Sequence, residues 1–240
     1  MIEIDDVPLH RLVRIQTKSY RDSIETLRLH QLDGGSTRCL YVDVSGSRGD
    51  IECTANLTVL ALNASEISDY QLEDNLFATK HVLLKFTGFP DDRSSEPYTN
   101  VLIRFVYNVF CRMGSCSNII INCKHGKNRC VMLSSRLAAL IQHGKNEPSK
   151  EAYSFYQQIC KSVSDGYNES DPSTWPKLCN NHFVQDMICG FKRRDGIKFP
   201  GAGRGFHVGE DPRGYVYCAH YAEPELLSNS VSTSMFGGGV

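Results

Sequence analysis

SNIIINCKHGKNRCVMLSSRLAALIQH, residues 117–143, is the stretch that decides the fold of this chain. Its residues 119–121 are wholly apolar, as in a strand that is buried on both faces of a sheet. Its residues 129–143 have apolar side chains at spacings of three and four, which is typical of an amphipathic helix. A buried strand, a glycine-bearing loop and a helix N-terminus together form a common phosphate site. The sequence therefore predicts an anion site in the loop 123–129, which begins with a cysteine and ends with an arginine.

The rest of the chain alternates strand patterns with helix patterns. Apolar or alternating runs predict further strands at 40–44, 57–62 and 81–86. Apolar spacing and helix-start residues predict further helices at 23–32, 97–114, 149–163 and 181–194. This alternation predicts an α/β fold, an αβα sandwich around a mostly parallel sheet. We expect an N-terminal extension at 1–35, one domain at 36–195 and a glycine-rich C-terminal tail at 196–240.

The composition sets limits on location and partners. The chain has 240 residues and a formal net charge of −1, so its overall charge does not attract it to nucleic acid or to an anionic membrane. No apolar run is long enough to cross a bilayer, and the N-terminus has no signal-peptide core. The 10 cysteines do not show the spacing of a disulfide framework. We therefore expect an intracellular monomer, cytoplasmic or nuclear, that does not bind a membrane.

The cysteine loop predicts nucleophilic chemistry on phosphorus. A thiol near a helix N-terminus, surrounded by N–H groups and a guanidinium, has a lowered pKa and is a thiolate at neutral pH. The thiolate of Cys123 can attack phosphorus and form a phosphocysteine intermediate. Arg129 can bind two phosphoryl oxygens at once, and it binds them more tightly as charge develops in the transition state. This chemistry requires no metal and no cofactor.

The reaction also needs a carboxylic acid that protonates the leaving oxygen. The loop 89–92, with the sequence FPDD, follows the strand predicted at 81–86, and we expect that strand to lie beside the cysteine strand. Asp91 is therefore the predicted general acid, and its neighbour Asp92 is the alternative. The same carboxylate takes a proton from water when the intermediate is hydrolysed.

Together these features resemble the cysteine-based protein tyrosine phosphatases, in their compact dual-specificity form. Residues 123–129 (CKHGKNR) match the family's Cys-x-x-Gly-x-x-Arg loop, and residues 89–91 (FPD) resemble its Trp-Pro-Asp acid loop. Residues 59–64 resemble an early strand of the family that ends in Asn-Ala or Asn-Cys. The resemblance covers the domain at 36–195. It implies an αβα fold, metal-free hydrolysis of phosphate esters on a phosphoprotein, and the roles given above for Cys123, Arg129 and Asp91.

Within that superfamily the loop is unusual. Four of its residues resemble the Cys-Thr-His-Gly-x-Asn-Arg loop of RNA 5′-triphosphatases: His125, Gly126, Asn128 and Arg129. Lys124 and Lys127 instead occupy the places of lysines in the tensin-homologue lipid phosphatases. Extra cations beside the site favour a substrate with more negative charge than one phosphotyrosine, although both lysines can equally point into solvent. Residues 124–129 are therefore the predicted phosphate-binding residues, and an RNA 5′ end is the alternative substrate.

Two positions depart from the family. The residue before the nucleophile is usually His and is Asn122 here, which carries no charge and stabilises a thiolate less. The residue after the arginine is usually Ser or Thr and is Cys130 here, a weak hydrogen-bond donor. We hypothesise that the intermediate breaks down slowly, and that Cys130 is a redox partner that forms a disulfide with oxidised Cys123. The alternatives are a small packed residue at position 130 and a phosphate-binding pseudophosphatase.

Overall fold

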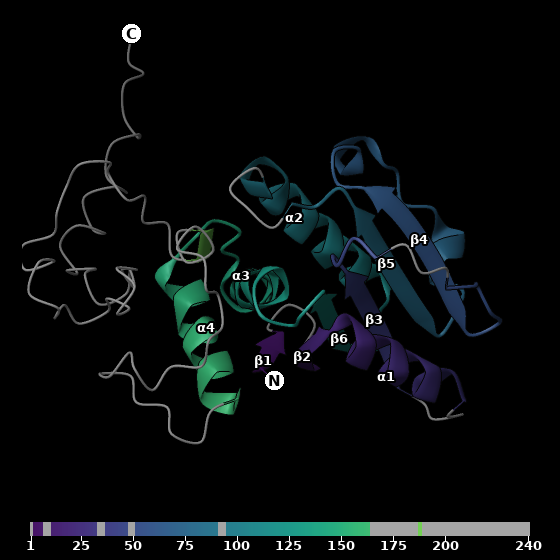
Figure 1. Ribbon diagram of the computed structural model, residues 1–240, viewed down its shortest axis with the longest axis horizontal. Coiled ribbons are helices and arrows are strands. Elements are labelled where there is room, and N and C mark those ends of the chain that lie inside the picture. Colours follow the sequence, from purple (N-terminus) through teal and green to yellow (C-terminus); the bar gives the residue numbers. More distant parts are fainter. Residues whose placement is uncertain are drawn as a thin grey trace, which may run out of the picture.

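The fold is built on a six-stranded sheet with the strand order β1-β2-β6-β3-β5-β4 (Figure 1). The computed structural model describes residues 2–6, 11–32, 37–47, 51–90, 95–163 and 187–188. The strands are β1 (Ile2–Asp6), β2 (Arg11–Ser19), β3 (Arg38–Asp43), β4 (Leu57–Asn63), β5 (His81–Thr87) and β6 (Cys116–Cys123). Strand β1 is antiparallel to β2, whereas β2, β6, β3, β5 and β4 run parallel to one another.

Helices cover both faces of this sheet, as Figure 1 shows. Helix α1 (Tyr20–Leu32) lies on one face, where its Leu27 packs among buried residues of the strands that include Tyr41 and Ile120. Helices α2 (Glu96–Arg112), α3 (Arg129–His143) and α4 (Lys150–Val163) lie on the other face and form the larger core cluster. Two short 3-10 helices, η2 (Ile67–Asp69) and η3 (Asp74–Phe77), connect β4 to β5.

The predicted α/β fold with a mostly parallel sheet is confirmed. The predicted strands correspond to β3, β4, β5 and β6, and four of the predicted helices correspond to α1, α2, α3 and α4. Of the helix predicted at 181–194, the structure describes only residues 187–188, which are helical. The tail predicted at 196–240 lies outside the described residues.

The segment 1–35 is not an extension separate from the domain, because it supplies β1, β2 and α1. Strand β2 pairs in parallel with the cysteine strand β6, from Arg14 opposite Asn118 to Ser19 opposite Cys123. The sequence did not predict β2 because its inward face carries few apolar residues. Only Val13 and Ile15 alternate with polar neighbours, which is too short a run to predict a strand.

Helix α3 occupies the centre of the larger core. It lies against the sheet and against both α2 and α4, so nearly all of its side chains are buried. Its Arg136 is only 2% exposed, and this guanidinium donates hydrogen bonds to the side-chain oxygen of Asn100 and to the carbonyl of Asn146. The N-terminus of α3, which follows the cysteine loop, is thereby held on a helix that cannot move without disturbing the core.

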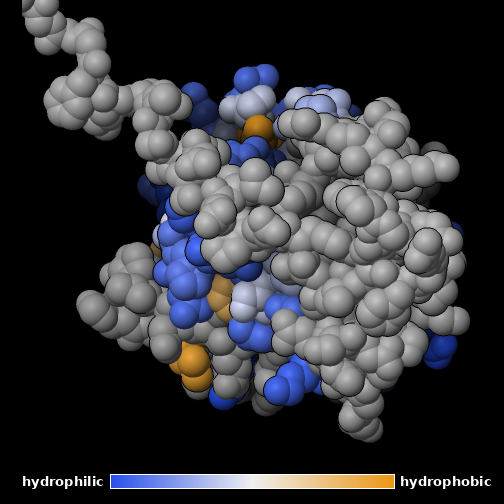
Figure 2. Space-filling model, turned by 90° about the vertical axis from the view of Figure 1, so that its left-hand side faces the viewer, coloured by the Kyte–Doolittle hydropathy of each residue, from blue (hydrophilic) through white to orange (hydrophobic). Residues whose placement is uncertain are grey.

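Helix α4 is buried on one side and exposed on the other. Its buried side consists of residues at the three- and four-residue spacing of an amphipathic helix, namely Ala152, Tyr153, Phe155, Tyr156, Ile159 and Cys160. On the face shown in Figure 2, which is the side of the molecule where α4 lies in Figure 1, the described residues are mainly hydrophilic. Among the described residues, no helix is both long and apolar enough to cross a membrane.

A buried histidine in this fold predicts sensitivity to acid. His81 at the start of β5 is 1% exposed and stacks on His30 of α1, with ring centroids 5.9 Å apart. Burial, reinforced by the charge of Lys80, lowers the pKa of His81 from 6.5 to about 4. The unfolded chain therefore binds more protons between these two pH values, so the free energy of unfolding falls as the pH drops through this window.

We expect urea unfolding measured from pH 7 to pH 4 to show this fall, and we expect His81→Phe to reduce it, because phenylalanine takes up no proton. The comparison is between the pH dependence of the two proteins rather than between their stabilities at one pH. If the free energy of unfolding fell with pH at the same slope in both proteins, the assignment to His81 would be contradicted.

Candidate active site

The candidate site lies where β6 ends and α3 begins. Cys123 is the last residue of β6 and is 3% exposed, and Arg129 is the first residue of α3 and is 9% exposed. The loop of residues 124–128 joins them, and Gly126 at its middle has φ +70. A strand, a loop with a left-handed glycine and a helix N-terminus are thus present in the predicted order. The N–H groups of the loop and of the first helical turn favour an anion at this position.

The surroundings of the Cys123 thiol favour its ionised form. Its Sγ lies 3.3 Å from Sγ of Cys130. The pKa of Cys123 is lowered from 9.0 to about 5, and the largest cause is the hydrogen bond with the Cys130 thiol, which acts as donor to the thiolate. Burial opposes this, but backbone hydrogen bonds from Cys130, Asn128 and His125 also lower the pKa. With this pKa, Cys123 is a thiolate at neutral pH, and the residue before it is the uncharged Asn122.

Arg129 connects this loop to the loop that follows β5. Its Nη1 donates a hydrogen bond of 3.0 Å to the carbonyl oxygen of Phe89, and Phe89 is 4% exposed. The prediction that β5 lies directly beside the cysteine strand is wrong, because β3 lies between β5 and β6. The loop after β5 nevertheless reaches Arg129 through its backbone. The predicted acid Asp91 and its alternative Asp92 lie outside the described residues.

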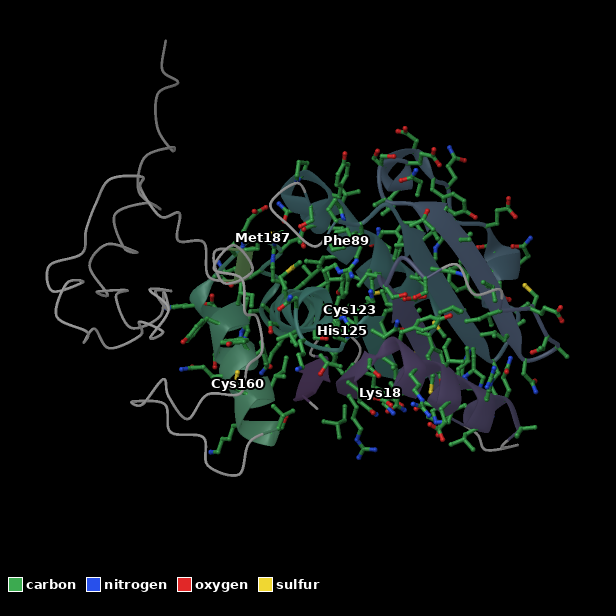
Figure 3. All side chains as sticks on the ribbon, in the orientation of Figure 1. Lys18, Phe89, Cys123, His125, Cys160 and Met187 are labelled. Atoms are coloured by element: carbon green, nitrogen blue, oxygen red, sulfur yellow. The ribbon has the colours of Figure 1, made fainter. Side chains whose placement is uncertain are left out.

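The end of β2 supports the cysteine loop from the other side. A Cβ atom added to Gly126 would lie 2.8 Å from the backbone nitrogen of Ser19 and 3.0 Å from the backbone carbon of Lys18. Figure 3 labels Cys123 and His125 at the centre of the molecule, with Phe89 and Lys18 on either side of them in this view. This contact was not predicted from the sequence, because β2 itself was not predicted.

The loop after β5 is braced by the end of β4. The amide N–H of Ala64 donates to the carbonyl of Thr87 at 2.9 Å, and Asn63 Oδ1 lies 2.9 Å from where a Cβ at Gly88 would be. Asn63 and Ala64 thus lie at the end of β4, which is the edge strand of the sheet. These two residues contact Thr87 and Gly88 at the end of β5. Strand β5 is two strands away from β6, which ends at the nucleophile.

The mouth of the loop carries exposed positive charge. Lys124, His125 and Lys127 are exposed, whereas Gly126 and Asn128 are half-buried. Cations at the rim raise the local concentration of anionic substrates and favour those with several negative charges. Among the described residues, no group of three or more His, Cys, Asp or Glu side chains is arranged to hold a metal ion.

Comparisons with protein-family models, with curated proteins and with solved structures find no match for this chain.

Proposed function

We propose that this chain hydrolyses phosphate esters through a phosphocysteine intermediate and has a fold of the dual-specificity phosphatase type. One observation carries the proposal. The buried thiol of Cys123 has a pKa of about 5, and the loop after it leads into α3, whose first residue is the buried Arg129. A thiol whose environment favours the charged form, in a loop that also favours a bound anion, is suited to attack phosphorus.

The reaction proceeds in two displacements. In the first, the Cys123 thiolate forms a bond to phosphorus while the bond from phosphorus to the leaving oxygen breaks, and Asp91 gives that oxygen a proton. In the second, water attacks the phosphocysteine, Asp91 takes a proton from the water, and the sulfur–phosphorus bond breaks. Arg129 holds the phosphoryl oxygens throughout. A guanidinium has five N–H donors, and the bond from Nη1 to the carbonyl of Phe89 uses one of them.

The substrate we propose is a phosphoprotein, with phosphate on tyrosine, serine or threonine. The exposed cations Lys124 and Lys127, with the exposed His125 in the same loop, also suit an RNA 5′ end with its several phosphates. The two classes differ in where their charge lies. A phosphopeptide has one dianionic group at the nucleophile, whereas an RNA end extends further charge along the rim of the loop.

The experiment that separates these substrates measures phosphate release from three of them: a phosphotyrosine peptide, a phosphothreonine peptide and triphosphate-ended RNA. Release from the peptides by wild type, and not by Cys123→Ser, is the expected result. Release from RNA alone would favour the 5′-phosphatase. Tight phosphate binding without release from any substrate would support a pseudophosphatase instead, and equal release by both proteins would exclude an enzyme that depends on Cys123.

We also propose that Cys130 protects Cys123 against oxidation. A hydroperoxide converts the thiolate to a sulfenic acid; the Cys130 thiol then attacks that sulfur, the S–S bond forms, and the S–O bond breaks with release of water. The 3.3 Å separation of the two sulfurs supports this step.

Wild type treated with hydrogen peroxide is therefore expected to lose two hydrogens in a Cys123–Cys130 disulfide and to recover its activity with dithiothreitol. Cys130→Ser is expected to be oxidised further, to the sulfinic acid, and not to recover. Peptide mass spectrometry distinguishes these products. Equal recovery of both proteins, without a disulfide in wild type, would contradict the role of Cys130.

A further inference from the structure

A polar pair is buried directly behind the nucleophile. Asp43, the last residue of β3, lies opposite Asn122, the residue before Cys123 on β6, and each of the two is 1% exposed. Side chains alternate between the faces of a sheet. Asp43 and Asn122 therefore share the face of Tyr41 and Ile120, which is covered by α1, whereas Cys123 belongs to the core on the opposite face.

Hydrogen bonds at this pair join β3 to β6 where the cysteine loop begins. Asn122 Nδ2 donates to Asp43 Oδ1 at 2.7 Å, and the amide N–H of Ser45 donates to the same oxygen at 2.8 Å. The amide N–H of Val44 donates to the carbonyl of Asn122 at 2.9 Å. Asn122 is thus held through its side chain and through its backbone. Its carbonyl carbon is bonded to the nitrogen of Cys123, so both constraints act next to the nucleophile.

The Asp43–Asn122 pair destabilises the folded state more than a contact that only joins two strands needs to. Asp43 Oδ2 is buried and has no hydrogen-bond partner, and an unsatisfied buried carboxylate oxygen destabilises the folded state. The pKa of Tyr20, at the start of α1, is raised first by burial and then by the charge of Asp43. A neutral side chain would join the strands at less cost. A carboxylate, however, accepts a hydrogen bond about twice as strong as a neutral acceptor does, so it fixes Asn122 more firmly.

We propose that Asp43 is a positioning residue, which acts through Asn122 to hold the backbone at Cys123 so that the thiolate stays within reach of the N–H groups of its loop. The role rests on the proposed function, because it assumes that Cys123 is the nucleophile. Asp43 lies on the other face of the sheet from the thiol and does not touch the substrate. Its effect therefore passes through the residue 122–123 peptide.

An exchange of the two side chains tests this role. Asn122→Asp places two carboxylates against each other, and we expect it to displace the backbone at Cys123. The pKa of Cys123, measured from the pH dependence of its alkylation by iodoacetamide, is expected to rise above about 5. The kcat for p-nitrophenyl phosphate is expected to fall by roughly 10- to 100-fold, with little change in KM. The double variant Asp43→Asn/Asn122→Asp restores one donor and one charged acceptor, and we expect both values to return close to wild type.

Tyr41→Phe is the matched control. It removes the part-buried hydrogen bond between Tyr41 and His30. Tyr41 lies on the same face of the same strand as Asp43, two residues before it. We expect it to lower the melting temperature and to leave the alkylation of Cys123 unchanged. If Asn122→Asp does not fold, Asp43→Asn is measured in its place, because it keeps an acceptor oxygen and removes only the charge; a raised pKa of Cys123 is again expected.

Two results would overturn the positioning role. The first is a double variant that regains its melting temperature but not the alkylation profile of wild type, which would make the pair purely structural. The second is an unchanged profile in Asp43→Asn. Alkylation needs no phosphatase activity, so the two proposals fail separately. If wild type hydrolyses no phosphate ester while the exchange still restores the alkylation profile, the proposed function fails, and Asp43 positions a thiolate that is not a nucleophile toward phosphorus.

Discussion

Cys123→Ser is expected to reduce phosphate-ester hydrolysis by roughly 10⁴-fold or more, because a serine hydroxyl is not ionised at neutral pH and its oxygen is a poor nucleophile without a base. The phosphate-binding groups are retained in this variant, namely the N–H groups of the loop and Arg129. We therefore expect it to bind a phosphopeptide about as well as wild type does. Turnover is measured with p-nitrophenyl phosphate, and binding by calorimetry with the phosphopeptide.

The matched control is Cys160→Ser, the same chemical change at another buried cysteine. Cys160 lies in α4, and burial raises its pKa to about 12, so its thiol is protonated at neutral pH. We expect this control to turn over at the wild-type rate, although the buried hydroxyl lowers its stability. Substantial hydrolysis by Cys123→Ser, or an equal loss in both variants, would contradict the role of Cys123.

Gly126→Ala is expected to have the second largest effect. The residue has φ +70, which an alanine adopts only with strain, and the new Cβ would lie 2.8 Å from the backbone nitrogen of Ser19. Backbone atoms cannot turn aside as the end of a long side chain can, so the loop itself must move. A displacement of this kind next to the nucleophile is expected to lower kcat by about 100-fold. Steady-state kinetics and the pKa of Cys123 measure this change.

Gly144→Ala is the control that separates the effect of backbone strain at a positive φ from the effect of moving the loop. Gly144 ends α3 with φ +67, and nothing lies within 4 Å of the position of its missing Cβ. This variant therefore has the same backbone strain without the collision. We expect it to lose about 1 kcal/mol of stability and to keep its activity. If the two glycine variants lost activity equally, the contact between Gly126 and Ser19 would have no role in the site.

The part of the fold that sequence could predict is the part with strong periodicity. Residues 119–121 are wholly apolar and lie within β6. The three- and four-residue spacing of apolar side chains after Arg129 predicted a helix that begins there, as α3 does. Strand β2 was missed because only Val13 and Ile15 give it an inward apolar face, so its place beside β6 arises from pairing rather than from local pattern.

The candidate site shows the same division. The order of cysteine, glycine and arginine predicted a loop between a strand and a helix N-terminus, because these residues are close along the chain. Contacts between distant segments had no such signal, as between Arg129 and Phe89 or between Asn122 and Asp43. Asp43 in particular appears in the sequence as one of the ordinary polar residues that alternate with apolar ones in the strand predicted at 40–44. Only the register of β3 against β6 brings it behind the nucleophile.

The most direct test of the central claim is to trap the phosphoenzyme. Wild type is mixed with p-nitrophenyl phosphate, quenched during turnover and digested, and the peptide that contains Cys123 is examined by mass spectrometry. We predict one phosphoryl group on the sulfur of Cys123, absent from Cys123→Ser and from wild type alkylated beforehand with iodoacetamide. Hydrolysis that continues at the wild-type rate after Cys123 has been alkylated would contradict the account.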